Sequence, residues 1–218
     1  MNDTSTTIAH SVFSHVESSP DTDPWSAFWS AAPAILFAAD THGAPQPDLS
    51  TEVRSRWTFD NLYLLFTCAY DANEPLNLKP DRDLEKETNE LWNWDVVEVF
   101  LGADANNIRR YKEFEISPQG EWVDLDVDLA QPNHEEGWVW TSGCETAARI
   151  DPENPIWYAF LRIPYGAIDS RAAASGNTLR INLCRVHGSK RRLTVWQPTM
   201  CATFHVPEVF GTLRLEKA

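Results

Sequence analysis

One short segment of the chain constrains its fold more than any other. Between residues 123 and 129 apolar residues alternate strictly with Asp124, Asp126 and Asp128. Successive side chains point to opposite faces in an extended strand, whereas a helix would mix the two sets. The segment therefore predicts a β-strand with one buried face and one acidic, solvent-facing side.

The rest of the chain carries the same signal in weaker form. Short stretches of aromatic and β-branched residues alternate with turn residues, and amphipathic helices of three or more turns are missing. The predicted strands are 51–59, 62–70, 96–101, 111–117, 122–129, 138–145, 156–163, 179–187, 193–197 and 211–215. Their number favours an all-β fold, a two-sheet antiparallel β-sandwich of the jelly-roll or immunoglobulin-like kind.

Turn residues and composition indicate how the chain is organised. Asp-Asn at 60–61, Pro-Gln-Gly at 118–120 and Gly-Ser-Lys at 188–190 each lie between predicted strands, so the flanking strands should pair as hairpins. Residues 1–24 are rich in Ser, Thr, Asp and Pro, and we expect a polar N-terminal tail there. Residues 25–218 then form the β-sandwich domain.

Charge argues against two classes of partner. The chain has 32 acidic residues against 18 Lys and Arg, a formal net charge of -14. This field repels nucleic acid and an anionic membrane surface, so we expect neither as a partner.

There is no apolar run of membrane-spanning length and no signal-peptide pattern, which predicts a cytoplasmic location. The four widely spaced cysteines include no C-x-x-C pair, and we expect them to be reduced.

Tryptophan is the most informative residue type for function. The chain has ten, more than a core of this size requires, and Trp92 and Trp196 stand near polar or turn residues. Flat aromatic walls suit the C–H faces of a pyranose ring, while charged or amide groups suit its hydroxyl rim. Glu98 shares one side of the chain with Trp92 by strand parity, so it is the candidate hydroxyl acceptor.

The residues around Glu98 resemble a known family. Residues 92–100, Trp-Asn-Trp-Asp-Val-Val-Glu-Val-Phe, are similar to the W-x-x-D-x-V-E-[IV]-F segment of carbohydrate-binding module family 9. Segments 53–66, 179–185 and 210–215 look like three further segments of that family and occur in the same order. The resemblance implies a jelly-roll-like sandwich that encloses a terminal sugar between two tryptophans, here Trp92 and Trp196, with Glu98 binding hydroxyls.

The resemblance also assigns roles to less certain positions. Asp95 either helps Glu98 at the hydroxyl rim or ties down the loop that carries Trp92. The family's arginine falls near Glu115, so Asn182 and Arg185 are the fallback hydrogen-bond donors. Family members bind calcium structurally, and Asp71, at the end of its strand, is the position expected for a ligand to Ca2+. No other cofactor is expected.

The function predicted from these observations is non-catalytic carbohydrate binding that serves carbohydrate catabolism. The expected ligand is a mono- or oligosaccharide, and a glycoside hydrolase is the expected protein partner. Two alternatives stay open at this point. One is a glycoside hydrolase, because the β-strand aspartates are ~6.7 Å apart, within the ~6.5–9.5 Å window of inverting enzymes. The other is a haem-binding β-sandwich that uses Met200 and His205.

Overall fold

The structure is a computed structural model that describes residues 7–131 and 137–217. The strands in this part of the chain are β1 (Ile8–Phe13), β2 (Ala34–Phe37), β3 (Thr51–Trp57), β4 (Asn61–Ala69), β5 (Val96–Gly102), β6 (Arg110–Ile116), β7 (Trp122–Asp128), β8 (Glu145–Asp151), β9 (Ile156–Pro164), β10 (Thr178–His187), β11 (Arg192–Val195) and β12 (Gly211–Glu216). The all-β prediction is confirmed.

Helical structure is confined to single turns in the described residues. The helices are α2 (Tyr165–Ile168) and the 3-10 turns η1 (Ala27–Trp29), η2 (Pro47–Leu49), η3 (Leu91–Asn93) and η4 (Pro207–Val209). A search of the same residues finds no helix with the length and apolar character needed to cross a membrane. All four cysteines lie among the described residues, and each is a free thiol.

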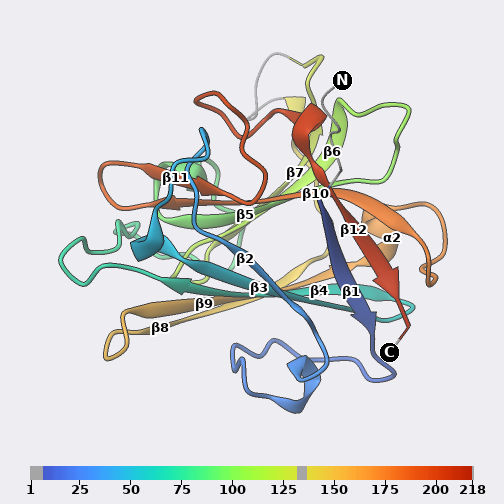
Figure 1. Cartoon of the computed structure of the whole chain (residues 1–218), viewed down its shortest axis with the longest axis horizontal. Coiled ribbons are helices and arrows are strands. Elements are labelled where there is room, and N and C mark those ends of the chain that lie inside the picture. Colours follow the sequence, from blue (N-terminus) through green and yellow to red (C-terminus); the bar gives the residue numbers. More distant parts are fainter. Residues whose placement is uncertain (1–6, 132–136, 218) are drawn as a thin grey trace.

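The described strands form one continuous sheet that folds over on itself. Ten strands follow the order β7-β6-β5-β10-β12-β1-β3-β4-β9-β8, while β11 pairs with β10 and β2 with β3. In Figure 1 the upper layer contains β7, β6, β5 and β10 and the lower layer β3, β4, β9 and β8, with β12 and β1 running between them. The predicted pair of layers is present, but the layers are joined edge to edge along one side, as in a partly closed barrel.

β1 joins the two layers, and it lies in the segment expected to be a polar tail. It pairs in parallel with β12 and, at Val12 and Phe13, with β3. Its Ser11 hydroxyl is fully buried and lies 2.8 Å from the hydroxyl of Ser55. The tail prediction is therefore wrong for residues 8–13, and the sheet is not purely antiparallel. The segment is short and half polar, so it carries no strong strand signal. It becomes a strand through its pairing with distant parts of the chain.

The main hydrophobic core fills the space between the two layers. Val99 of β5 pairs with Leu183 of β10 in the upper layer, and Leu64 of β4 pairs with Leu161 of β9 in the lower layer. All four side chains are fully buried in this core. Because side chains alternate along a strand, the neighbours of Val99 and Leu183 must point to the outer face of the upper layer.

A second apolar cluster covers that outer face. Val96 and Phe100 of β5 belong to it, as do Val123, Leu125 and Val127 of β7. The predicted alternation of β7 is thus confirmed, but its apolar face points outward from the main core. The outer face of the upper layer is a packed interior of its own, and the site described below lies within it.

The hairpins agree with the sequence, whereas one predicted strand does not. The three predicted turns join β3 to β4, β6 to β7 and β10 to β11. The predicted strand at 138–145 is wrong, because only Val139 forms an isolated bridge there and β8 begins at Glu145. Trp138 is anchored instead by its indole N–H, which donates to the carbonyl oxygen of Asp128 at 2.8 Å.

Candidate functional site

β5 carries the glutamate that the sequence singles out. Val97 and Val99 point into the main core, so Glu98 between them points to the outer face. Its side chain is only 3% exposed, and Cys184 of β10 stands opposite it. The carboxylate therefore lies inside the second apolar cluster, where an unbalanced charge is costly.

Two glutamates from β6 meet Glu98 on the same face. Glu115 stands directly opposite Glu98 in the β5–β6 pairing, and Glu113 lies two residues earlier on its strand. One carboxylate oxygen from each of the three lies within 4.8 Å of the other two, and all three side chains are buried. We call Glu98, Glu113 and Glu115 the glutamate trio.

Burial and mutual repulsion change how the trio titrates. Burial raises the pKa of Glu98 well above its usual range, Glu113 adds to this effect and the Arg191 guanidinium opposes it. Burial likewise raises the pKa of Glu113 to about 8. The pKa of Glu115 rises through burial and through the charges on Glu98 and Glu113. Without a cation beside them, the three carboxyl groups are therefore harder to ionise than ordinary glutamates.

A small pocket opens beside the trio. It has a volume of about 180 Å3, and its lining includes Trp92, Glu98, Glu113, Arg191, Phe204 and His205. Trp92 is half-buried and comes from η3, just before β5. The fold thus brings together two of the predicted site residues, Trp92 and Glu98, in what we call the Trp92 pocket.

The β10–β11 hairpin supplies the cationic side of this pocket. Arg191 has a backbone φ of 52° in that turn, and its Nη1 donates to the carbonyl oxygen of Trp92 at 2.6 Å. The hairpin therefore positions both a guanidinium group and, through this hydrogen bond, the backbone beneath the indole.

The segment after β11 supplies a further part of the lining. His205 Nδ1 lies 2.7 Å from the hydroxyl oxygen of Tyr111, which extends from β6. The His205 ring also packs against Phe100 and Trp138, at centroid distances of 5.3 and 5.4 Å. These contacts hold the imidazole at the pocket.

Asp95 connects the segment that carries Trp92 to the β10–β11 hairpin. Its side chain is fully buried and accepts hydrogen bonds from the backbone N–H of Gly188 at 2.6 Å and from His187 Nδ1 at 2.8 Å. These bonds connect the start of β5 to the β10–β11 hairpin. Asp95 does not line the Trp92 pocket.

Trp196 lies on the opposite face of the upper layer. Its backbone N–H donates to the carbonyl oxygen of Leu183 at 2.8 Å, so its side chain shares the inward face of Leu183, whereas Glu98 faces outward beside Cys184. The indole packs against the main core. The structure therefore does not form the expected slot between Trp92 and Trp196, because strand parity separates the two rings.

The two fallback donors are also committed elsewhere. Asn182 is fully buried, and its side chain amide exchanges hydrogen bonds with the backbone of Gln197 at 3.1 and 3.0 Å. Arg185 is fully buried on the inward face, where its Nη1 donates to the carbonyl oxygen of Ala69 at 2.7 Å and its guanidinium lies over Trp157. Neither residue lines the Trp92 pocket.

Asp71 is exposed and forms a local turn. Its Oδ1 accepts hydrogen bonds from the backbone and side chain nitrogens of Asn73, both at 2.8 Å. Among the described residues, the group of acidic, His or Cys side chains close enough to hold a metal ion is the glutamate trio, and Asp71 is not part of it. Among the described residues, no group of potential metal ligands includes Asp71, so the structure does not support the expectation of a calcium ligand there.

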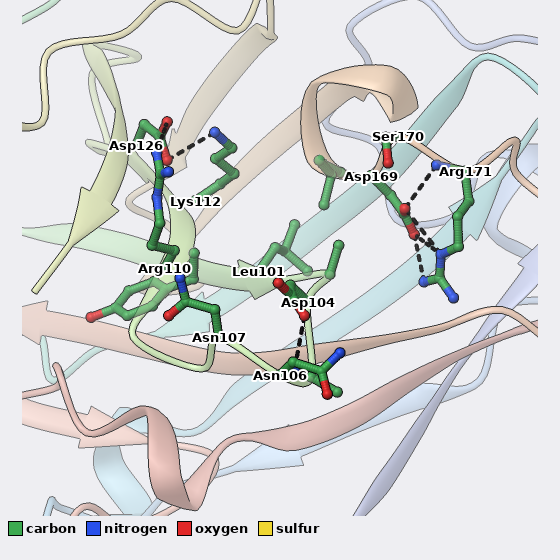
Figure 2. A pocket seen from close by; sticks show the side chains of 14 residues that line it. Leu101, Asp104, Asn106, Asn107, Arg110, Lys112, Asp126, Asp169, Ser170 and Arg171 are labelled. Atoms are coloured by element: carbon green, nitrogen blue, oxygen red, sulfur yellow. Dashed lines mark hydrogen bonds and ion pairs between the residues drawn. The ribbon is translucent and has the colours of Figure 1, made fainter.

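A larger cavity, the Lys112 cavity, lies at the β5–β6 connection and the end of α2 (Figure 2). Its volume is about 640 Å3. Two ion pairs lie in its lining: Lys112 Nζ lies 2.9 Å from Asp126, and Arg171 Nη2 lies 2.6 Å from Asp169. Figure 2 shows these two pairs on opposite sides of the cavity. The residues that line it include no tryptophan.

The β7 aspartates do not form a catalytic pair. Asp124 is 1% exposed and accepts hydrogen bonds from the backbone and hydroxyl of Ser142, so the predicted solvent-facing side is wrong at this position. The segment before β8 covers it. Asp126 pairs with Lys112 and Arg110. Neighbouring carboxylates on one strand cannot flank a glycosidic bond from both sides, and each of these two is already engaged by other side chains.

The two candidate haem ligands do not share a site. Met200 is 66% exposed and does not line the Trp92 pocket, which contains His205. The imidazole of His205 is engaged with Tyr111 instead. The arrangement of these residues therefore does not support a haem-binding role.

Sequence reasoning missed four residues of the pocket region. Glu113 could have been found, because it is two residues from Glu115 on a predicted strand that pairs with β5. Arg191, Phe204 and His205 come from a hairpin turn and an irregular segment. Their positions depend on how those segments fold over the sheet, which strand periodicity does not report.

Comparisons with known proteins add to this picture. The model of a family described as "Carbohydrate family 9 binding domain-like" matches residues 22–218. No curated protein matches the chain.

Several solved structures share the fold. A carbohydrate-binding module family 9 from Caldicellulosiruptor kristjanssonii in complex with cellotriose matches with a TM-score of 0.70 and 12% identity, over 97% of this chain and 95% of that one. Its complex with glucose matches with a TM-score of 0.69 and 12% identity, over 97% of each chain. A protein from Bacteroides uniformis matches with a TM-score of 0.73 and 15% identity, over 97% and 100%.

Proposed function

The chain belongs to the carbohydrate family 9 binding domain-like family, and on that premise we propose that it binds carbohydrate without transforming it. The observation that carries this proposal is the Trp92 pocket, where an aromatic face, a carboxylate and a guanidinium meet. The modules from Caldicellulosiruptor kristjanssonii were solved with cellotriose and with glucose. Glucose and its oligosaccharides are therefore the first ligands to test.

Each group of the pocket suits one part of a sugar ring. The indole of Trp92 would pack on the C–H face, and Glu98 would hydrogen-bond to the hydroxyl rim. Arg191 would donate to hydroxyls from the other side, in place of the donors expected at Asn182 and Arg185. The second aromatic contact would come from Phe204 or His205 in place of Trp196.

The size of the pocket limits the ligand and its affinity. A volume of about 180 Å3 is below the ~300–1,000 Å3 of sites for drug-sized ligands, so one terminal ring would enter. A monosaccharide of roughly 12 heavy atoms at about -0.3 kcal/mol per atom gains about -4 kcal/mol, which corresponds to a Kd near millimolar. Weak binding is therefore the expected result.

The trio does not suit glycosidic bond cleavage. Hydrolysis needs an ionised carboxylate and a protonated carboxyl group that flank the bond, with separate pKa values. Burial raises all three pKa values of the trio, and the three groups converge on one point. The proposed role is therefore binding in carbohydrate catabolism, with the hydrolysis supplied by a glycoside hydrolase as partner.

Calorimetry and tryptophan fluorescence with glucose and cellotriose test the proposal. We expect saturable binding that weakens at least tenfold in Trp92→Ala and in Glu98→Gln. Asn107→Ala, in the lining of the Lys112 cavity, should bind as the unmodified chain does. Loss of binding in Asn107→Ala alone would move the site to that cavity, and no binding to any sugar of a glycan array would remove the proposal.

A further inference from the structure

The glutamate trio contains more acidic groups than sugar binding requires, because Glu115 does not line the Trp92 pocket. We propose that Glu98, Glu113 and Glu115 form a binding site for a calcium-sized divalent cation that prefers oxygen ligands. The site is separate from the exposed Asp71. It also does not depend on the proposed sugar binding.

The spacing of the three carboxylates matches the size of such a cation. Metal–oxygen distances are about 2.0–2.1 Å for Mg2+ and about 2.3–2.6 Å for Ca2+, so two oxygens bound to one ion lie no farther apart than about 4.2 or 5.2 Å. The trio offers one oxygen from each residue within 4.8 Å of the others. This spacing allows all three carboxylates to reach one ion. Mg2+ keeps several of its waters and is usually held by one or two carboxylates, so a buried set of three favours Ca2+.

Unsatisfied oxygens provide a second, independent observation. Glu115 is 1% exposed, and its carboxyl group interacts with that of Glu113, but neither of its oxygens has a hydrogen-bond donor from outside the trio among the described residues. Oε2 of Glu113, a residue 2% exposed, also lacks one there. Buried polar atoms almost always have a partner, and those that do not call for a missing water or ion. Both side chains converge on the same point as Glu98, so a single ion would satisfy them together.

The charges near the trio also leave room for a divalent ion. Three ionised carboxylates face one guanidinium, that of Arg191, which leaves two uncompensated negative charges. The residues opposite the trio in the sheet are Cys184, Val123 and Leu125, which bring no counter-charge. One divalent cation would neutralise these two charges.

The chemistry of the ligands selects the kind of metal. Carboxylate oxygens suit hard cations such as Ca2+, and thiolate sulfur would be needed to favour zinc or copper. Among the described residues, the group close enough to hold one ion consists of three glutamates and includes no cysteine. Glu98 and Glu113 also line the Trp92 pocket, which would supply the entry path and the water ligands.

Terbium luminescence tests the site, because Tb3+ resembles Ca2+ and is sensitised by a nearby indole such as Trp92. The full chain is first stripped with chelator and then titrated with Tb3+. We expect saturable emission that Ca2+ displaces at a concentration at least tenfold lower than Mg2+. Glu115→Gln should weaken Tb3+ binding at least tenfold, and Ca2+ should raise the thermal midpoint of the unmodified chain but not that of the variant.

Matched variants make the outcome unambiguous. Asp126→Asn removes an acidic group on the other face and should leave Tb3+ binding unchanged, and so should Asp71→Asn. Glu113→Gln repeats the Glu115→Gln test in case that variant fails to fold. The proposal would be overturned if both glutamine variants bound Tb3+ as tightly as the unmodified chain does. It would also be overturned if the unmodified chain showed no saturable Tb3+ binding. Trp92→Ala separates the two proposals, since it should lose sugar binding but keep calorimetric Ca2+ binding.

Discussion

Trp196 and Gly211 are in direct contact across the upper layer. A Cβ atom placed on Gly211 would lie 2.5 Å from Cζ3 of the Trp196 ring and 2.8 Å from the carbonyl oxygen of Thr7. The indole therefore occupies the space that a side chain would need at the start of β12. This contact holds Trp196 on the inward face, away from the Trp92 pocket.

We expect Gly211→Ala to destabilise the protein by about 1–3 kcal/mol, because the added methyl group overpacks against the indole and the backbone. Urea denaturation measures the change. Gly166→Ala is the matched control, since a Cβ there meets nothing within 4 Å, and its effect should be small. A neutral result for Gly211→Ala would show that the Trp196 ring moves aside easily.

Asp95 should be a structural rather than a sugar-binding residue. Asp95→Ala removes the acceptor of His187 and Gly188 inside the protein, and we expect a loss of about 3 kcal/mol in the free energy of unfolding. Sugar affinity, measured well below the thermal midpoint, should change little. A large loss of affinity in a still folded variant would instead favour the alternative in which Asp95 acts at the hydroxyl rim.

The N-terminal strand should be essential for folding. A chain that begins at Ser14 lacks β1, which leaves the facing edges of β12 and β3 unpaired and opens the joint between the layers. We expect this variant to be largely insoluble or to unfold at much lower urea concentration. A chain that begins at Thr7 keeps β1 and serves as the control. Equal stability of the two would contradict the central place of β1.

The Asp48–Arg192 pair should make stability depend on pH. Hydrogen bonding from Arg192 holds the pKa of Asp48 below its usual range. A lowered pKa in the folded state stabilises the protein above the ordinary Asp value of about 3.9, and this contribution is lost as pH falls through the lowered value. The Asp48 side chain is 38% exposed, so solvent screens the pair. We expect Asp48→Asn to cost about 0.5–1 kcal/mol at pH 7 and progressively less as pH falls through the lowered pKa of Asp48.

The glycoside hydrolase alternative has a direct test. The purified chain should release no reducing sugar from cellotriose over a prolonged incubation, and Asp126→Asn should behave identically. Sustained release that disappears in Asp126→Asn would reinstate that alternative, because Asp126 is otherwise engaged by Lys112 and Arg110.

Local patterns in the sequence predicted much of the fold. The alternation of β7, the three hairpin turns and the strand character around Glu98 depend on residues close together in the chain, whose periodicity sets their conformation. The same patterns could not identify β1 or reject a strand at 138–145. In both cases the outcome depends on distant partners, namely β12 and β3 for β1 and the Asp128 carbonyl for Trp138.

The sequence alone determined that this is an all-β chain of the family 9 type, with Trp92 and Glu98 as candidates for one site. Only the tertiary structure decided which candidates meet. It separated Trp196 from Trp92, buried Asn182 and Arg185, and joined Glu113 and Glu115 to Glu98. The physical reason is that a side chain's face follows from the register between strands. Register is set by hydrogen bonds between segments far apart in the chain, so motif spacing does not report it.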